Sequence, residues 1–254
     1  MKTNGTHILL IRVILFILIT LYSLIVFGQP DYDFRNPTLI SGTDKQVNAV
    51  YRYNNVKSGV NANVTITALT NGITVNNIDS GSGFGEALQP VIDVPGRTSG
   101  YLEMKIDFLN TATGEPMQQS EVSLTPLDVD GESYSGNGIY EYDMIKLNNG
   151  YADFDMTDGE LFMDFPEGWV TGTNMVAINC PGIDTTAKQV MFSVVNESVT
   201  SVIIRVGADN HTFSNKQRLR SIYFKKFSYK NAYFASSGNK TNQVGKSEGS
   251  LTPE

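Results

Sequence analysis

The sequence predicts an all-β fold, an antiparallel two-sheet sandwich of jelly-roll-like type that follows an N-terminal signal peptide. From residue 31 onward, apolar and polar residues alternate with a period of two, which is typical of strands with one buried face. Turn-forming pairs such as Asn71-Gly72, Asn149-Gly150 and Asp158-Gly159 separate these segments. No apolar stripe at helical spacing lasts for the ~10 residues that a helix needs. A closed barrel is the alternative arrangement of the same strands.

The clearest strand is expected at residues 101–109, where apolar side chains would face the core and charged ones the solvent. The segment 219–227 is expected to be a late strand with a basic outer face, because Arg220, Lys225 and Lys226 interrupt its apolar residues. Further strands are expected at 49–53, 64–68, 73–75, 87–94, 119–128, 140–146, 161–165, 190–194 and 202–206.

The two ends of the chain differ from the strand-rich part. Residues 1–28 contain Lys2, Arg12 and an apolar run, the pattern of a secretory signal peptide cleaved after Gly28. The alternative is an uncleaved membrane anchor at 8–27, and both readings export the remainder, which makes the protein secreted or attached to the cell surface. One domain is expected at 30–235, because sandwiches of this size commonly form a single core. Residues 236–254 are expected to be a flexible tail or linker.

Composition excludes several functions. The net charge of −7 repels phosphate backbones and anionic membranes, so neither nucleic acid nor membrane is an expected partner, apart from an uncleaved leader. The single cysteine, Cys180, cannot form an intramolecular disulfide. Beyond the leader there is one histidine, His211, in a turn-rich segment without a nucleophile elbow. No catalytic residues are assigned, and the protein is predicted not to be an enzyme.

An acidic stretch is the best candidate for a cofactor site. Asp128 and Asp130 are followed by a glycine, and Glu141 lies on the next expected strand, so their oxygens could bind calcium. The spacing of an EF-hand is absent, because residue 139 is an isoleucine where that motif needs a glutamate. The alternative is a hairpin turn in which the aspartates bond their own backbone.

Aromatic residues are the candidates for ligand binding. Tyr51, Tyr53 and Trp169 lie among asparagines and glycines, and sugar-binding sandwiches stack sugar rings on such side chains. The alternative is that these three residues belong to the core or to a sheet edge.

Five motifs resemble an uncharacterised secreted β-sandwich module of flavobacterial (Bacteroidetes) cell-surface proteins. They are VYRYNNV at 50–56, NVTI at 63–66, EALQP at 86–90, DVDG at 128–131 and QRLRSIY at 217–223. The resemblance implies a cell-surface or secreted context and transfers no catalytic residue.

These observations together predict a non-catalytic extracellular binding or adhesion module. Its expected partner is a glycan or a surface protein, and calcium is the one cofactor considered. One alternative is a secreted polysaccharide hydrolase that uses paired carboxylates, which would need a cleft between two acids. The other is a structural spacer domain.

Overall fold

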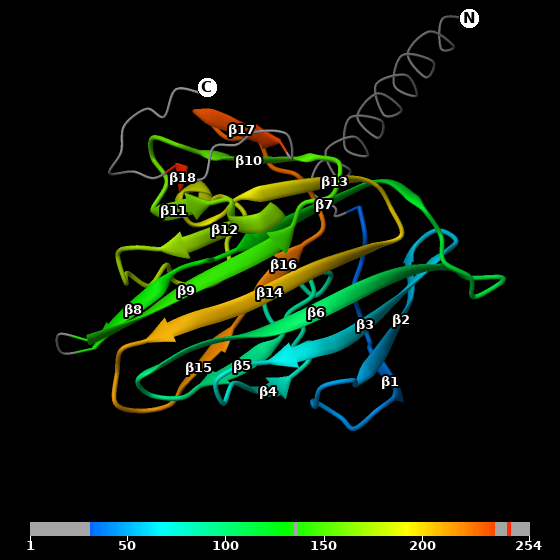
Figure 1. The fold of residues 1–254 in the computed structure, drawn as a ribbon, viewed down its shortest axis with the longest axis horizontal. Coiled ribbons are helices and arrows are strands. Elements are labelled where there is room, and N and C mark those ends of the chain that lie inside the picture. Colours follow the sequence, from blue (N-terminus) through cyan, green and yellow to red (C-terminus); the bar gives the residue numbers. More distant parts are fainter. Residues whose placement is uncertain (1–30, 135–136, 237–242, 245–254) are drawn as a thin grey trace, which may run out of the picture. The chain divides into compact units, whose positions relative to one another are not determined.

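The computed structural model describes residues 31–134, 137–236 and 243–244 (Figure 1). These residues form β-strands and two short 3₁₀ turns, η1 (Pro166–Gly168) and η2 (Lys188–Val190), and contain no α-helix. No helix in the described ranges is long and apolar enough to cross a membrane. The expected signal peptide at 1–28 lies outside the described residues.

One layer is a ten-stranded sheet in which all neighbouring strands are antiparallel. Figure 1 shows its central strands running side by side. In spatial order the strands are β1 (Thr38–Ser41), β2 (Val50–Lys57), β3 (Val60–Leu69), β6 (Thr98–Asn110), β14 (Ser201–Asn210), β9 (Asn137–Lys146), β12 (Trp169–Asn174), β11 (Leu161–Asp164) and β18 (Gln243–Val244), with β8 (Gly131–Tyr134) paired to β9.

The other layer consists of two smaller antiparallel sheets. Its five-stranded sheet contains, in spatial order, β16 (Ser221–Tyr223), β7 (Gln119–Leu127), β13 (Ser193–Val199), β10 (Tyr151–Asp155) and β17 (Ala232–Ser236). Its three-stranded sheet contains β15 (Lys216–Leu219), β5 (Val91–Val94) and β4 (Thr74–Asn77). The chain passes from the smaller to the larger of these sheets through one residue, Arg220, between β15 and β16.

The core lies between the layers, as the alternating pattern requires. In β6 the four apolar positions Leu102, Met104, Ile106 and Phe108 are fully buried, while the residues between them are partly exposed. They belong to one hydrophobic cluster that also takes in residues of β5, β7 and β13 from the second layer. The predicted all-β, antiparallel sandwich is therefore confirmed.

Three local predictions differ from the structure. The segment 219–227 is not one strand with a basic outer face, because the side chain of Arg220 is fully buried. The strand expected at 190–194 begins only at Ser193, after the turn η2. Within the segment expected to be a flexible tail, residues 243–244 form β18, which pairs with β11.

Candidate functional site

Two acidic side chains occupy core positions of the ten-stranded sheet. Along β9, the inward positions are Ile139, Glu141, Asp143 and Ile145, and all four are buried. A carboxylate in such a place needs hydrogen bonds or a cation, because an unpaired buried charge costs several kcal/mol. The alternation that builds the sheet thus creates a demand for positive charge inside the sandwich.

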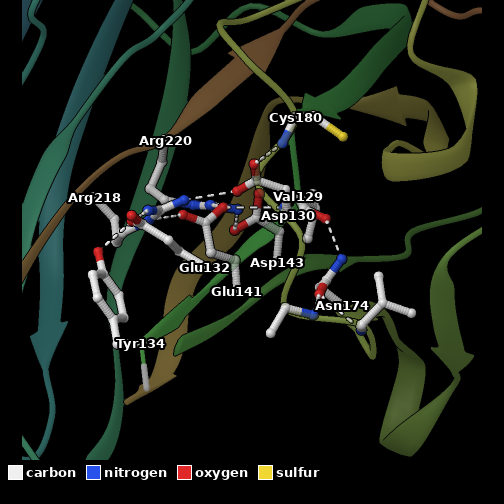
Figure 2. Close-up of polar contacts among 12 residues, drawn as sticks. Val129, Asp130, Glu132, Tyr134, Glu141, Asp143, Asn174, Cys180, Arg218 and Arg220 are labelled. Atoms are coloured by element: carbon white, nitrogen blue, oxygen red, sulfur yellow. Dashed lines mark hydrogen bonds and ion pairs between the residues drawn. The ribbon is translucent and has the colours of Figure 1, made fainter. Parts of the chain in front are cut away.

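Arg218 and Arg220 meet this demand from the facing layer (Figure 2). Nη2 of Arg220 lies 3.0 Å from Oδ1 of Asp143, and its Nη1 contacts Glu141. Nη2 of Arg218 lies 2.7 Å from Oδ1 of Asp130, and its Nε contacts Glu141. Glu141 is therefore shared by both guanidinium groups, and the ion pairs tie β9 to the segment that joins the two smaller sheets.

More carboxylates than guanidinium groups take part in this cluster. Arg218 also reaches Glu132, with Nη1 and Oε2 separated by 3.3 Å, so four acids face two arginines. Burial raises the pKa of Asp143 well above its usual value and also raises the pKa of Asp130, against the pull of Arg218. Burial lowers the pKa of Arg220 to about 10. Asp143 and Asp130 therefore bind protons more readily in the folded protein than free aspartates do.

The predicted calcium ligands lie at this cluster. Asp130 and Glu141 are buried and adjacent, since the backbone N–H of Asp130 donates to Oε2 of Glu141 at 3.3 Å. Oδ2 of Asp130 also accepts from the backbone N–H of Cys180 at 2.8 Å. Asp128 has a left-handed backbone, as an aspartate in a turn often does. Among the described residues no group of three or more His, Cys, Asp or Glu has the arrangement of a metal site, and the guanidinium groups stand where a cation would. Calcium here stays a prediction.

The two predicted ligand tyrosines lie in the core. Tyr53 is fully buried and packs edge-on against Phe34, with ring centroids 5.1 Å apart. Tyr51 is also buried, and its hydroxyl donates to Asp44 at 2.6 Å. Both rings are covered by protein, which differs from the expectation of exposed stacking platforms. Their inward parity on β2 follows from the same alternation that buries Ala62 and Val64 on β3.

Trp169, the third predicted ligand residue, lies on the outward face of the ten-stranded sheet. Its ring is partly exposed and stacks on Arg205, with Cζ 4.0 Å from the ring centroid. Cζ of Arg205 also lies 4.6 Å from the ring centroid of Tyr101. Nε of Arg205 donates to Glu103 at 2.7 Å. Arg205 thus contacts two aromatic rings and is itself held by an ion pair.

This stack is one end of a longer row of aromatic side chains. On β9, Tyr142 lies opposite Gly207 and Tyr140 lies opposite Asp209 in β14. Glycine is required at 207, because a Cβ there would approach the ring of Tyr142 to 2.7 Å. From Trp169 to Tyr140 the row runs along six residues of β9, which is on the order of 20 Å at the usual rise per residue. We call Trp169, Tyr101, Tyr142 and Tyr140, with Arg205 between them, the aromatic row.

A rigid loop presents a further aromatic side chain next to β14. Phe213 is 82% exposed, and Cζ of Arg97 lies 3.9 Å from its ring centroid. The loop is held from within by Asn210, whose buried side-chain amide donates to the carbonyls of Val94, Pro95 and Ser214 at 3.0–3.1 Å. An exposed apolar ring on a fixed loop is an available contact point for a partner.

Sequence reasoning found Trp169 and missed its neighbours. Tyr101 and Tyr142 carry a usable signal, because each lies one position away from an inward residue of a clear strand and must therefore face outward. The sequence around Phe213 carries no such signal, because the exposure of this ring depends on a loop that the side chain of Asn210 holds in place. His211, which the turn-rich segment predicts to be an exposed loop histidine, is exposed, and its Nε2 lies 2.8 Å from Oδ2 of Asp209.

No protein-family model matches the sequence, and no curated protein matches it. Among solved structures, the N-terminal domain of an adhesin from Streptococcus gordonii has a TM-score of 0.50 at 10% identity, over 79% of this chain and 64% of that one. The glucan binding protein C of Streptococcus mutans has a TM-score of 0.41 at 12% identity, over 73% and 62% of the two chains. The adhesin domain of PrgB from Enterococcus faecalis has a TM-score of 0.36 at 11% identity, over 72% and 63%.

The first of these matches shows a shared fold. At 10% identity it transfers no residue roles. The chain spans less than two thirds of the length of each of the three structures. The sandwich architecture therefore has a solved counterpart in a streptococcal adhesin, while function has to be argued from the side chains of this protein.

Proposed function

We propose that the sandwich is a non-catalytic binding module of an exported protein, and that it adheres to extracellular glycan through the aromatic row. The observation that carries the proposal is the stack of Trp169, Arg205 and Tyr101 on the outward face of the ten-stranded sheet. Partly exposed rings that contact a paired arginine offer apolar area with little loss of side-chain entropy, and neighbouring charged groups can bond sugar hydroxyls. The shared fold with an adhesin domain and the predicted signal peptide fit this role.

The aromatic row lies on the open face of a sheet and not in a deep pocket, and this position selects the kind of ligand. A sheet face on the order of 20 Å long suits an extended polysaccharide or a surface-bound glycan better than a small free metabolite, which is usually enclosed in a cavity. Lys146, whose Nζ lies 5.1 Å from the ring centroid of Trp169, adds a hydrogen-bond donor at one end of the row. The flavobacterial cell-surface context stays part of this proposal.

A glycan-array screen of the purified protein, followed by affinity measurement on the best ligand, tests the proposal. We expect Trp169→Ala to weaken binding at least about tenfold, which corresponds to ~1.4 kcal/mol. Phe234→Ala is the matched control, because Phe234 is 54% exposed on β17, outside the aromatic row. Equal affinity of the wild type and Trp169→Ala would remove the row as the binding surface, and absence of any glycan ligand would favour the spacer alternative.

Calcium at Asp128, Asp130 and Glu141 is tested separately. A cation bound only by the folded state raises the melting temperature by mass action, so a chelator should lower it. If the melting temperature is the same with and without chelator, Arg218 and Arg220 are sufficient counter-charges and the calcium proposal fails.

A further inference from the structure

A polar concavity lies beside β2, toward the opposite edge of the ten-stranded sheet from Trp169. Two adjoining depressions of about 210 and 250 Å³ share Arg35 and Asn36 as a common wall. The first is completed by Asp33, Asn54 and Asn55, and the second by Pro37, Asp79, Ser80, Gly81 and Gly85. We call the pair the Arg35 cleft.

The backbone at one side of the cleft is held by bonds to β2 and to the turn at Glu86. The N–H of Asp33 donates to the carbonyl of Val56 in β2 at 2.7 Å, and the N–H of Phe34 donates to the carbonyl of Glu86 at 2.9 Å. Asn36 and Asn55 both have left-handed backbones, with φ of 55° and 53°. Such conformations cost about 1 kcal/mol or more outside glycine and often mark functional positions. These bonds hold one wall of the cleft, and the wall at 79–85 belongs to the loop between β4 and β5.

Three asparagine side chains of the cleft have hydrogen-bonding capacity that the described part of the protein does not use, whereas Oδ1 of Asp33 contacts Arg35 and Oδ1 of Asp79 accepts from the backbone N–H of Gln89 at 3.1 Å. Within the described residues, the side-chain amides of Asn36, Asn54 and Asn55 form no hydrogen bond with another side chain or backbone group, and all three residues are exposed. An asparagine amide offers both donors and an acceptor, while the carboxylates of Asp33 and Asp79 only accept when ionised. Adjacent hydroxyl groups of a sugar, each both donor and acceptor, match this combination.

The charged side chains of the Arg35 cleft indicate which class of sugar it can bind. Nε of Arg35 lies 2.8 Å from Oδ1 of Asp33, and its Nη2 lies 3.3 Å from Oε2 of Glu86. One guanidinium thus faces two carboxylates, and Asp79 adds a third acid. Burial raises the pKa of Asp79 to about 6, so at neutral pH the cleft carries an excess of negative charge. Phosphorylated, sulfated or uronate sugars are disfavoured there. Pockets for drug-sized ligands measure ~300–1,000 Å³, so each smaller depression fits a compact ligand.

We propose that the Arg35 cleft binds a neutral saccharide unit through the amides of Asn36, Asn54 and Asn55 and the carboxylates of Asp33 and Asp79. The cleft is separate from the aromatic row. It lies at β2, whereas Trp169 lies in β12, with β3, β6, β14 and β9 between them in the sheet. A glycan could therefore be held at two independent places on one molecule.

Titration of the ¹⁵N-labelled protein with glucose, galactose, mannose, fucose and N-acetylglucosamine tests the proposal. The readout is the side-chain amide resonances of the cleft asparagines, followed up to about 100 mM sugar, because weak sites have millimolar dissociation constants. We expect shifts of these resonances with at least one sugar. Asn36→Ala and Asn54→Ala should each weaken binding at least fivefold, whereas the control Asn179→Ala, in the exposed loop after β12, should not.

The titration can distinguish binding at the Arg35 cleft from binding at the aromatic row. Trp169→Ala should leave the cleft titration unchanged, so the row and the cleft can fail independently. The proposal is overturned if no sugar moves the asparagine resonances, or if calcium chloride alone moves them. Tighter binding of galacturonate or glucose 6-phosphate than of the neutral sugars would refute the charge argument. Release of new reducing ends from an oligosaccharide would instead identify Asp33 and Asp79 as hydrolytic carboxylates.

Discussion

Replacing Arg220 with methionine should destabilise the protein strongly. The methionine fills much of the volume of the arginine stem but removes the charge that faces Glu141 and Asp143 between the layers. Breaking a buried ion pair by removing one partner typically costs ~3–5 kcal/mol, because the remaining charge is left without compensation. Arg220 compensates two buried acids, so we expect a loss near the upper end of that range.

The expected loss converts into a measurable shift in melting temperature. For domains of ~150–250 residues, 1 kcal/mol corresponds to ~2–4 °C, so a loss of about 5 kcal/mol in Arg220→Met should lower the melting temperature by roughly 10–20 °C. The loss should be smaller near pH 5 than near pH 8, because burial raises the pKa of Asp143 and protonation removes its orphaned charge. Adding Asp143→Asn to Arg220→Met should recover part of the loss for the same reason.

Urea unfolding followed by circular dichroism gives the free energies directly. The matched control is Arg205→Met, which breaks an ion pair with Glu103 on the partly exposed outer face, where such pairs contribute about 1 kcal/mol or less. If Arg220→Met loses no more than Arg205→Met, the buried cluster does not stabilise the sandwich and the reasoning fails.

Three further variants test individual contacts. Asp128→Asn should flatten the pH dependence of stability. Burial and the charge of Asp130 raise the pKa of Asp128 from 3.8 to about 7, so the stability it contributes is present at low pH and is lost as pH rises through about 7; equal slopes in both proteins would contradict this. Tyr53→Phe should raise the unfolding free energy by about 1 kcal/mol, because the buried hydroxyl has no hydrogen-bond partner among the described residues, and a loss in urea unfolding would show that the hydroxyl is satisfied. Gly207→Ala should lower it by ~1–3 kcal/mol, since a Cβ would lie 2.6 Å from the carbonyl oxygen of Gly100; an unchanged melting curve would refute the close packing.

The sequence was informative where apolar and polar residues alternate over a long segment. The segments 101–109 and 140–146 were predicted as strands and lie within β6 and β9. By contrast, β10 was not among the predicted strands, although its apolar and acidic residues alternate; it has only five residues, and four of them are buried. Periodicity located β9 even though its buried face carries Glu141 and Asp143, but it did not show which face of that strand is buried.

The same limit explains what was missed at the site. Arg220 was expected on an outer face because isolated charges usually face water, and nothing within 219–227 indicates otherwise. The missing clue lies elsewhere, on β9, where Glu141 and Asp143 share the parity of Ile139 and Ile145 and so need internal cations. The Arg35 cleft was not predictable, because it joins residues whose proximity depends on the tertiary fold.

The pairing of β14 with β6 governs how this polypeptide can reach its native state. Arg205 and Glu103, which face each other across that ladder, are 102 positions apart along the chain. Contacts so distant in sequence carry a large loop-closure cost and give folding times of roughly milliseconds to seconds in all-β domains. The central sheet also cannot be completed before residue 210 is available, because β14 supplies the neighbour of both β6 and β9. A growing chain would therefore lack a complete central sheet until residue 210 has emerged, which leaves time for holding chaperones to engage it.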